Sequence, residues 1–144
     1  MQTSNLMKTL LSKAAILACE DLPTTDVDVP EWGGTVRVKG MTGAQRDAFE
    51  DSLFIDVPSA DGKTIARKQD TKNIRAKLVA ASLVDAEGAA LFTQGEIDTL
   101  AQKSARALSR VFEAAQRLNG MTPEAKEEAK NASAPGQSGA STSA

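Results

Sequence analysis

The sequence predicts an α+β fold that is mainly α-helical, in which a small N-terminal β-hairpin packs with about four helices and a disordered C-terminal tail follows. Apolar residues recur at helical spacing through most of the chain, whereas apolar and polar residues alternate within 26–39. Aromatic residues make up only 3% of the 144 residues, and alanine is abundant. The core must therefore come from Leu, Val, Ala and a few Phe, a composition that favours helices.

The first expected helix covers residues 5–19, with Ser4 ahead of it as N-cap. Its apolar side chains are spaced to share one face, which consists of Leu6, Leu10, Ala14 and Leu17.

Apolar residues then recur at every second position, which predicts two strands on either side of the loop Pro30-Glu31-Trp32-Gly33-Gly34. Valines alternate with acids in the first strand and with bases in the second. If the strands are antiparallel, acids and bases can pair across them, although a solvated sheet face explains the same charges. Because an isolated hairpin is marginally stable, its valine face must lie against helices or another chain.

Three further helices are expected. The capping-box pattern Thr42-Gly43-Ala44-Gln45 opens a helix through about residue 54, and a helix over about 70–84 follows later. A second capping box, Thr93-Gln94-Gly95-Glu96, opens the longest helix, which extends to about residue 119. Its inner face is predicted to comprise Ile97, Leu100, Ser104, Leu108, Val111, Ala115 and Leu118.

The remaining segments carry weaker patterns. Residues 55–69 show no sustained period and are predicted to form a mobile connection. Residues 1–120 are expected to form a single globular domain. Residues 121–130 are expected to form a short helix only conditionally, and residues 131–144, without charge or large apolar side chains, are expected to be disordered.

Composition excludes several function classes. A net charge of -2 disfavours nucleic-acid binding, and no stretch approaches the roughly 20 apolar residues of a membrane helix. The absence of His and the single Cys remove the usual general base, the commonest metal ligand and any intrachain disulfide. We therefore expect no enzyme, and no catalytic, cofactor-binding or metal-binding residue. Lys8 and Lys13 interrupt the N-terminal apolar residues, so no secretory signal is expected and a cytoplasmic location is the default.

One segment has the length of a calcium-binding loop. Asp85 to Glu96 places acids at the first, third and twelfth positions, but Ala89 and Ala90 stand where a ligand and the turn glycine are needed. A turn between two helices explains these residues better.

Candidate partner-binding residues lie in two regions. Lys103, Arg106, Arg110 and Arg117 share the back of the last expected helix and could meet an acidic partner. The alternative is a solvated face in which Glu113 pairs with Arg110 or Arg117. The sole Trp, Trp32, either anchors the hairpin on the domain's own core or serves as an interface hot spot.

The order of these parts resembles a known family. The segments VPEWGGTVRVKGMTGAQRDAFE and RAKLVAASLVDAEGAALFTQGEIDTLAQKSARALSRVFEAAQRLNG are similar to the tail assembly chaperones of long-tailed, siphovirus-type bacteriophages, over about residues 5–120. The resemblance implies a non-enzymatic protein that binds the tape-measure protein, keeps it soluble and helps to recruit tail-tube subunits. Trp32, Arg106, Arg110 and Arg117 are the residues we expect to contact partners, and self-association is a further option.

The resemblance also implies a second product. Many members use a programmed frameshift to make a longer form that engages the tail-tube protein, so this chain would be the short form. Ala129-Lys130-Asn131 can be encoded by GCA AAA AAC, which contains the slippery heptamer A AAA AAC. Such a chaperone is expected in the host cytoplasm during assembly and to be absent from the mature virion. The alternative is a minor tail or head-tail connector protein that remains in the virion, with a hairpin that adds to a neighbouring sheet.

Overall fold

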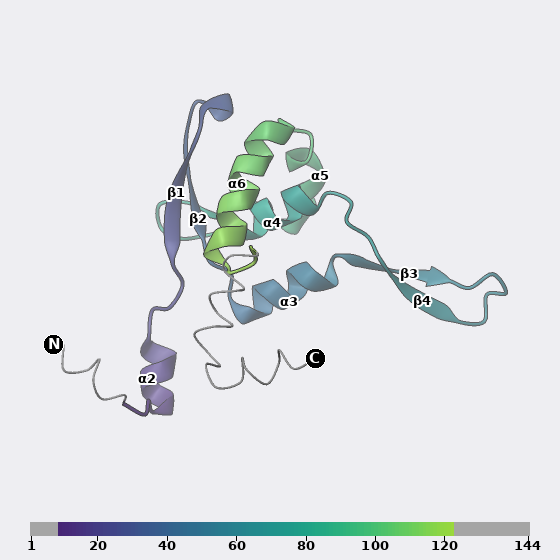
Figure 1. Ribbon diagram of the computed structural model, residues 1–144, viewed down its shortest axis with the longest axis horizontal. Helices are drawn as coiled ribbons and strands as arrows, with labels where there is room; N and C mark the ends of the chain where they lie inside the picture. The colour runs from purple at the N-terminus through teal and green to yellow at the C-terminus, as the bar shows by residue number, and fades with distance from the viewer. Residues whose placement is uncertain (1–8, 123–144) are drawn as a thin grey trace, which may run out of the picture.

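The computed structural model describes residues 9–122 (Figure 1). Two short 3-10 turns, Pro30–Trp32 and Gln94–Glu96, accompany the regular elements. In chain order these elements are α2 (Lys13–Ala18), β1 (Thr24–Val29), β2 (Gly34–Lys39), α3 (Gly43–Asp51), β3 (Phe54–Pro58), β4 (Ile65–Gln69), α4 (Ile74–Ser82), β5 (Leu83–Val84), α5 (Ile97–Leu100) and α6 (Ala105–Leu118).

The predicted N-terminal hairpin is present as part of a three-stranded antiparallel sheet. The strand order is β1-β2-β5, and β1 pairs with β2 from Thr24↔Lys39 to Val29↔Gly34. Gly33 closes the turn with φ +75°, a left-handed conformation that glycine adopts without steric cost. The expected cross-strand charge pairing is confirmed, because Arg37 Nε donates to Asp26 Oδ1 at 2.8 Å.

The core lies between this sheet and helices α4 and α6. The sheet contributes its inward valines, Val29 and Val38, both fully buried. Helix α4 is surrounded by other elements, because it contacts α3, α5 and α6. Four of the residues predicted for the inner face of the last helix are buried, namely Leu100, Leu108, Val111 and Ala115.

Helix α3 begins at the predicted capping box. Thr42 Oγ1 accepts the backbone N–H of Gln45 at 3.0 Å, and Gln45 Oε1 accepts the backbone N–H of Thr42 at 2.9 Å. The neighbouring Met41 donates its backbone N–H to Asn119 Oδ1 at 2.8 Å, although the two residues are 78 positions apart. The end of α6 therefore fixes the start of α3.

The prediction of one long last helix is wrong. After Thr93, the chain forms a 3-10 turn and the short α5, and only at Ala105 does α6 begin. Ser104, expected on the inner face, is the exposed N-cap of α6, and its Oγ accepts the backbone N–H of Ala107 at 3.2 Å. Serine competes with helical hydrogen bonding in this way, which explains the break that apolar spacing did not reveal.

The prediction of an irregular connection over residues 55–69 is also wrong. These residues form most of a second antiparallel hairpin, β3 and β4, which projects from the rest of the domain (Figure 1). Asp56 pairs with Arg67, and the turn closes at Gly62 with φ +71°. Because most of these side chains are exposed, both faces mix polar and apolar residues and show no alternation.

The first helix is shorter than expected. Within the described residues it begins at Lys13, and Ser12 is its N-cap, with Oγ accepting the backbone N–H of Ala15 at 3.1 Å. Residues 5–8 of the predicted helix and its predicted N-cap, Ser4, lie outside the described residues. No α2 residue is buried, and Leu10, just before the helix, is 98% exposed. The part of the predicted apolar face that the structure describes is therefore exposed, and no part of the chain within 9–122 covers it.

The third predicted helix also ends early, because Leu83 and Val84 leave it to pair with β2. The expected conditional helix over 121–130 and the expected disordered tail over 131–144 lie outside the described residues, apart from Met121 and Thr122. Within 9–122, no helix is long and apolar enough to cross a membrane.

Candidate functional site

An ion pair joins the tip of the first hairpin to α6. Arg110 Nε lies 2.9 Å from Glu31 Oε1, and Arg110 Nη2 lies 3.2 Å from Glu31 Oε2. The hydrogen bond from Arg110, supported by a backbone hydrogen bond and by the nearby charge of Arg106, holds the pKa of Glu31 below its ordinary value. Arg110 thus pairs with Glu31 and not with Glu113, which sequence reasoning had offered as its partner.

A pocket of about 540 Å³ lies beside this ion pair, and we call it the hairpin-tip pocket. Its lining residues come from the hairpin tip, from the segment before α5, and from α5 and its end: Glu31, Trp32, Phe92, Thr99, Leu100 and Lys103. The lining thus combines charged and apolar side chains, a mixture that suits an amphipathic protein surface.

Trp32 both packs against the core and lines the hairpin-tip pocket. The indole is partly buried against the core cluster, as the anchor interpretation expects. Its Nε1 is buried and has no hydrogen-bond partner among the described residues. The side chain also lines the hairpin-tip pocket, so the packing against the core leaves part of it facing the open space. Contact with a partner stays a prediction.

Three of the four cations predicted to share one helix face, Arg106, Arg110 and Arg117, lie in α6 at spacings that keep them on one side of it. Lys103 lies in the break before α6 and lines the hairpin-tip pocket, where Arg106 and Arg110 lie close to Glu31. Arg117 lies in the last turn of α6. The structure therefore removes only Lys103 from the predicted set on the helix, and it places Arg110 between Glu31 at the hairpin tip and Arg117 at the end of α6.

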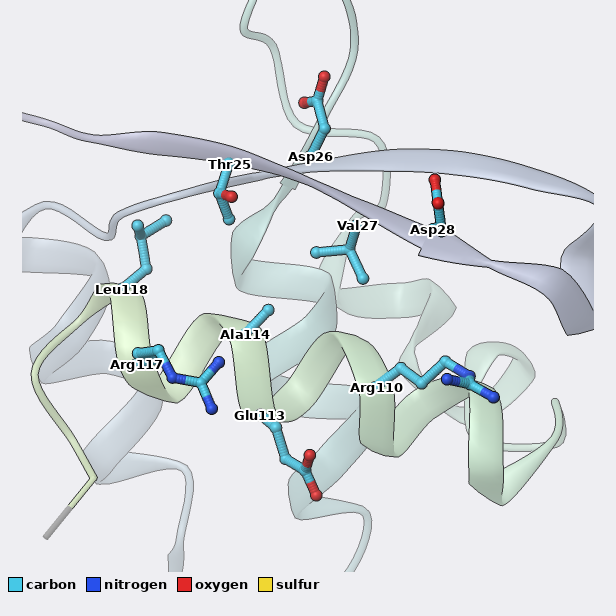
Figure 2. A pocket seen from close by; sticks show the side chains of 9 residues that line it. All are labelled: Thr25, Asp26, Val27, Asp28, Arg110, Glu113, Ala114, Arg117 and Leu118. Atoms are coloured by element: carbon cyan, nitrogen blue, oxygen red, sulfur yellow. The ribbon is translucent and has the colours of Figure 1, made fainter. Parts of the chain in front are cut away.

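A second hollow, the edge groove, runs between β1 and α6 (Figure 2). It measures about 550 Å³ and is lined by residues 25–28 of β1. From α6 it is lined by Arg110, Glu113, Ala114, Arg117 and Leu118. Figure 2 shows Val27 pointing from the strand toward the helix, and Ala114 pointing from the helix toward the strand. The groove thus has a small apolar floor between charged side chains.

The calcium-loop-length segment uses its acids to hold a turn. Asp85 Oδ1 accepts the backbone N–H groups of Glu87 and Ala89, each at 2.9 Å. Glu96 Oε1 accepts the backbone N–H of Thr93 at 2.9 Å, which confirms the second capping box. Residues 9–122 contain no cluster of three or more side chains able to hold a metal ion.

Sequence reasoning missed the residues that complete these surfaces. Glu31 is next to Trp32 and belongs to the segment 20–31, which contains acids but no base. That excess of negative charge indicates a basic contact, which the structure places within the chain at Arg110. Phe92 and Leu100 line the hairpin-tip pocket from the segment before α5 and from the last residue of α5, and no local pattern brought them together with Trp32. The edge groove depends on how α6 lies along β1, a tertiary arrangement.

Grooves lined by both half-buried apolar and charged side chains form a surface suited to binding other proteins. A family described as phage tail assembly chaperone matches residues 11–131, so the chain belongs to the phage tail assembly chaperone family. No curated protein matches the chain. Among solved structures, the tail assembly chaperone of bacteriophage HK97 is similar, with 15% sequence identity and a TM-score of 0.49. The match covers 81% of this chain and 92% of that one.

Replacing Glu31 by glutamine is expected to reduce the acid sensitivity of the domain's stability. The pKa of Glu31 is lower in the folded domain than in the unfolded chain, so the charged carboxylate stabilises the fold above the ordinary carboxyl pKa. That contribution is lost as the pH falls through the lowered pKa of the folded state. Urea unfolding at a series of pH values from neutral to strongly acidic measures the slope, with Glu113→Gln as the control. Equal slopes for the two variants would contradict this assignment.

Proposed function

We propose that this chaperone binds the tape-measure protein, keeps it soluble and helps to recruit tail-tube subunits around it during tail assembly. Membership of the tail assembly chaperone family is the observation that carries the proposal. A tape-measure protein is a long chain rich in apolar helical surface, which is the kind of client that needs a partner before assembly. Binding of that surface would lower the concentration of aggregation-prone free chain by mass action.

The client-binding residues in this proposal are Trp32, Arg106, Arg110 and Arg117. Trp32 supplies an aromatic anchor at the hairpin-tip pocket, and tryptophan and arginine are the residues most enriched among interface hot spots. Arg106 and Arg110 lie near Glu31 beside that anchor, and Arg110 also lines the edge groove together with Arg117. The hairpin-tip pocket is thus the first contact region of the proposal, and Arg117 extends it along α6.

The proposal includes a longer product made by frameshifting near Lys130, which would recruit the tail-tube protein. The short and long forms would act in the cytoplasm of the host and leave the tail before the virion is complete. The slippery codon sequence that Ala129-Lys130-Asn131 permits supports this part of the proposal.

The test is co-expression of the native reading frame, with its downstream DNA, together with the tape-measure protein. We expect more soluble tape-measure protein than in its expression alone, and a minor product whose intact mass diverges after Lys130. Purified particles are then analysed for both forms. An unchanged soluble fraction, together with this chain in finished particles, would contradict the chaperone role and favour a minor tail or connector protein.

A further inference from the structure

Strand β1 has a free outer edge, because it pairs only with β2 within the described residues. The backbone N–H of Gly40 donates to the carbonyl of Pro23 at 2.8 Å, which fixes the hydrogen-bonding phase of the antiparallel pair. Hydrogen-bonded and non-hydrogen-bonded residue pairs alternate along such a ladder. Every second β1 residue therefore directs its backbone N–H and C=O away from β2, and these residues are Thr24, Asp26 and Asp28.

Side-chain contacts agree with this phase. Residues in non-hydrogen-bonded pairs have closer side chains. Asp26 contacts Arg37 at 2.8 Å, and Thr35 Oγ1 donates to Asp28 Oδ1 at 2.8 Å. Both acids thus belong to pairs whose backbone groups face outward.

The edge groove lies where an added strand would place its side chains. A strand paired with β1 would lie about 4.8 Å from it. Every second side chain of that strand would then point to the same side as Val27, toward Ala114 and Leu118 of α6 (Figure 2). Small apolar side chains fit this position.

The opposite face of β1 is acidic. Asp26 is paired with Arg37, but Asp28 bonds only to the hydroxyl of Thr35 among the described side chains. Two copies of this chain joined edge to edge at β1 would bring their acids together, which is destabilising. The charges discourage self-pairing, as charged edge strands commonly do, and favour a basic partner strand.

We propose that an extended segment of a partner protein pairs with the free edge of β1, with small apolar side chains toward α6 and basic side chains beside Asp26 and Asp28. The backbone groups of the edge supply the hydrogen bonds, and the edge groove and the acids select the sequence. The edge groove shares Arg110 and Arg117 with the residues proposed to bind the client, but it does not include Trp32. The proposal therefore does not depend on the role of Trp32, and the peptides used below test it without the client.

The first test uses a capped peptide in which Lys and Val alternate, with a Glu and Val peptide of equal length as control. Amide hydrogen exchange of the full chain, followed by NMR, is measured with each peptide. We expect the Lys and Val peptide to slow exchange at Thr24, Asp26 and Asp28, whose N–H groups face outward. The amides of Thr25 and Val27, already bonded to β2, serve as internal references.

The second test separates the backbone from the side chain. Asp26→Pro and Asp26→Ala both remove the ion pair with Arg37, but only the proline removes the outward N–H. We expect Asp26→Pro to weaken peptide binding about fivefold relative to Asp26→Ala, the effect of one lost hydrogen bond. Ala114→Gln fills the edge groove without a change of charge and should also weaken binding, which keeps the proposal testable if the proline variant does not fold.

Three results would overturn the proposal. One is equal protection by both peptides. Another is equal binding by the proline and alanine variants together with normal binding by Ala114→Gln. The third is protection of the outward amides that rises with protein concentration in the absence of peptide, which would assign the edge to a second copy of this chain.

Discussion

Replacing Leu78 by alanine is expected to lower the free energy of unfolding by about 2–5 kcal/mol. Leu78 is fully buried in α4, the helix that contacts α3, α5 and α6. Truncation removes apolar contacts and leaves a cavity. The surrounding helices relax only partly into it, because each is also held by its other contacts. Urea unfolding followed by circular dichroism measures the change.

The matched control is Ile65→Ala in β4, because Ile65 is also a large aliphatic residue but is 72% exposed. Its substitution should change stability by about 0.5 kcal/mol or less. Similar losses in the two variants would mean that α4 does not form the centre of the core.

Replacing Trp32 by alanine is expected to weaken binding of the tape-measure protein about tenfold or more, if the proposed client site is correct. The substitution removes the indole, and with it the apolar surface that Trp32 contributes to the hairpin-tip pocket. Because Trp32 also packs against the core, some stability should be lost with it. Co-purification of the client, with unfolding measured in parallel, records both effects.

Two controls make this result interpretable. Trp32→Phe keeps an aromatic ring against the core, so it should preserve stability better than the alanine variant while still reducing client binding. Lys103→Ala removes a charged lining residue of the same pocket and leaves the indole in place. Normal client retention by Trp32→Ala, with an unchanged far-ultraviolet spectrum, would reject Trp32 as a client contact.

Local chemistry was readable from the sequence wherever the structure depends on near neighbours. The capping boxes at Thr42 and Thr93 were predicted, and pairing of acids with bases across the first hairpin was one of two explanations offered for its charges, which the contact of Asp26 with Arg37 supports. A capping box joins two residue types three positions apart, and a cross-strand pair joins residues at equal distances from the hairpin turn. Both spacings can be seen in the sequence.

The errors have three different physical causes. The β3–β4 hairpin shows no alternation because neither of its faces is buried in the domain. The last helix was predicted through Ser104, because apolar spacing continues across the break and only the capping hydrogen bond to Ala107 shows it. The pairing of Arg110 with Glu31 spans 79 residues, so no local rule could select it over Glu113.

The hydrogen bond from Met41 to Asn119 has a consequence for how the protein is made. Asn119 joins the end of α6 to the start of α3, and both residues of this contact are translated before Lys130. The proposed longer product would therefore share this contact, and all of residues 9–122, with the shorter one. The two products would present the same described surfaces to the client. Any difference in the proteins that they recruit would have to come from the residues translated after Lys130.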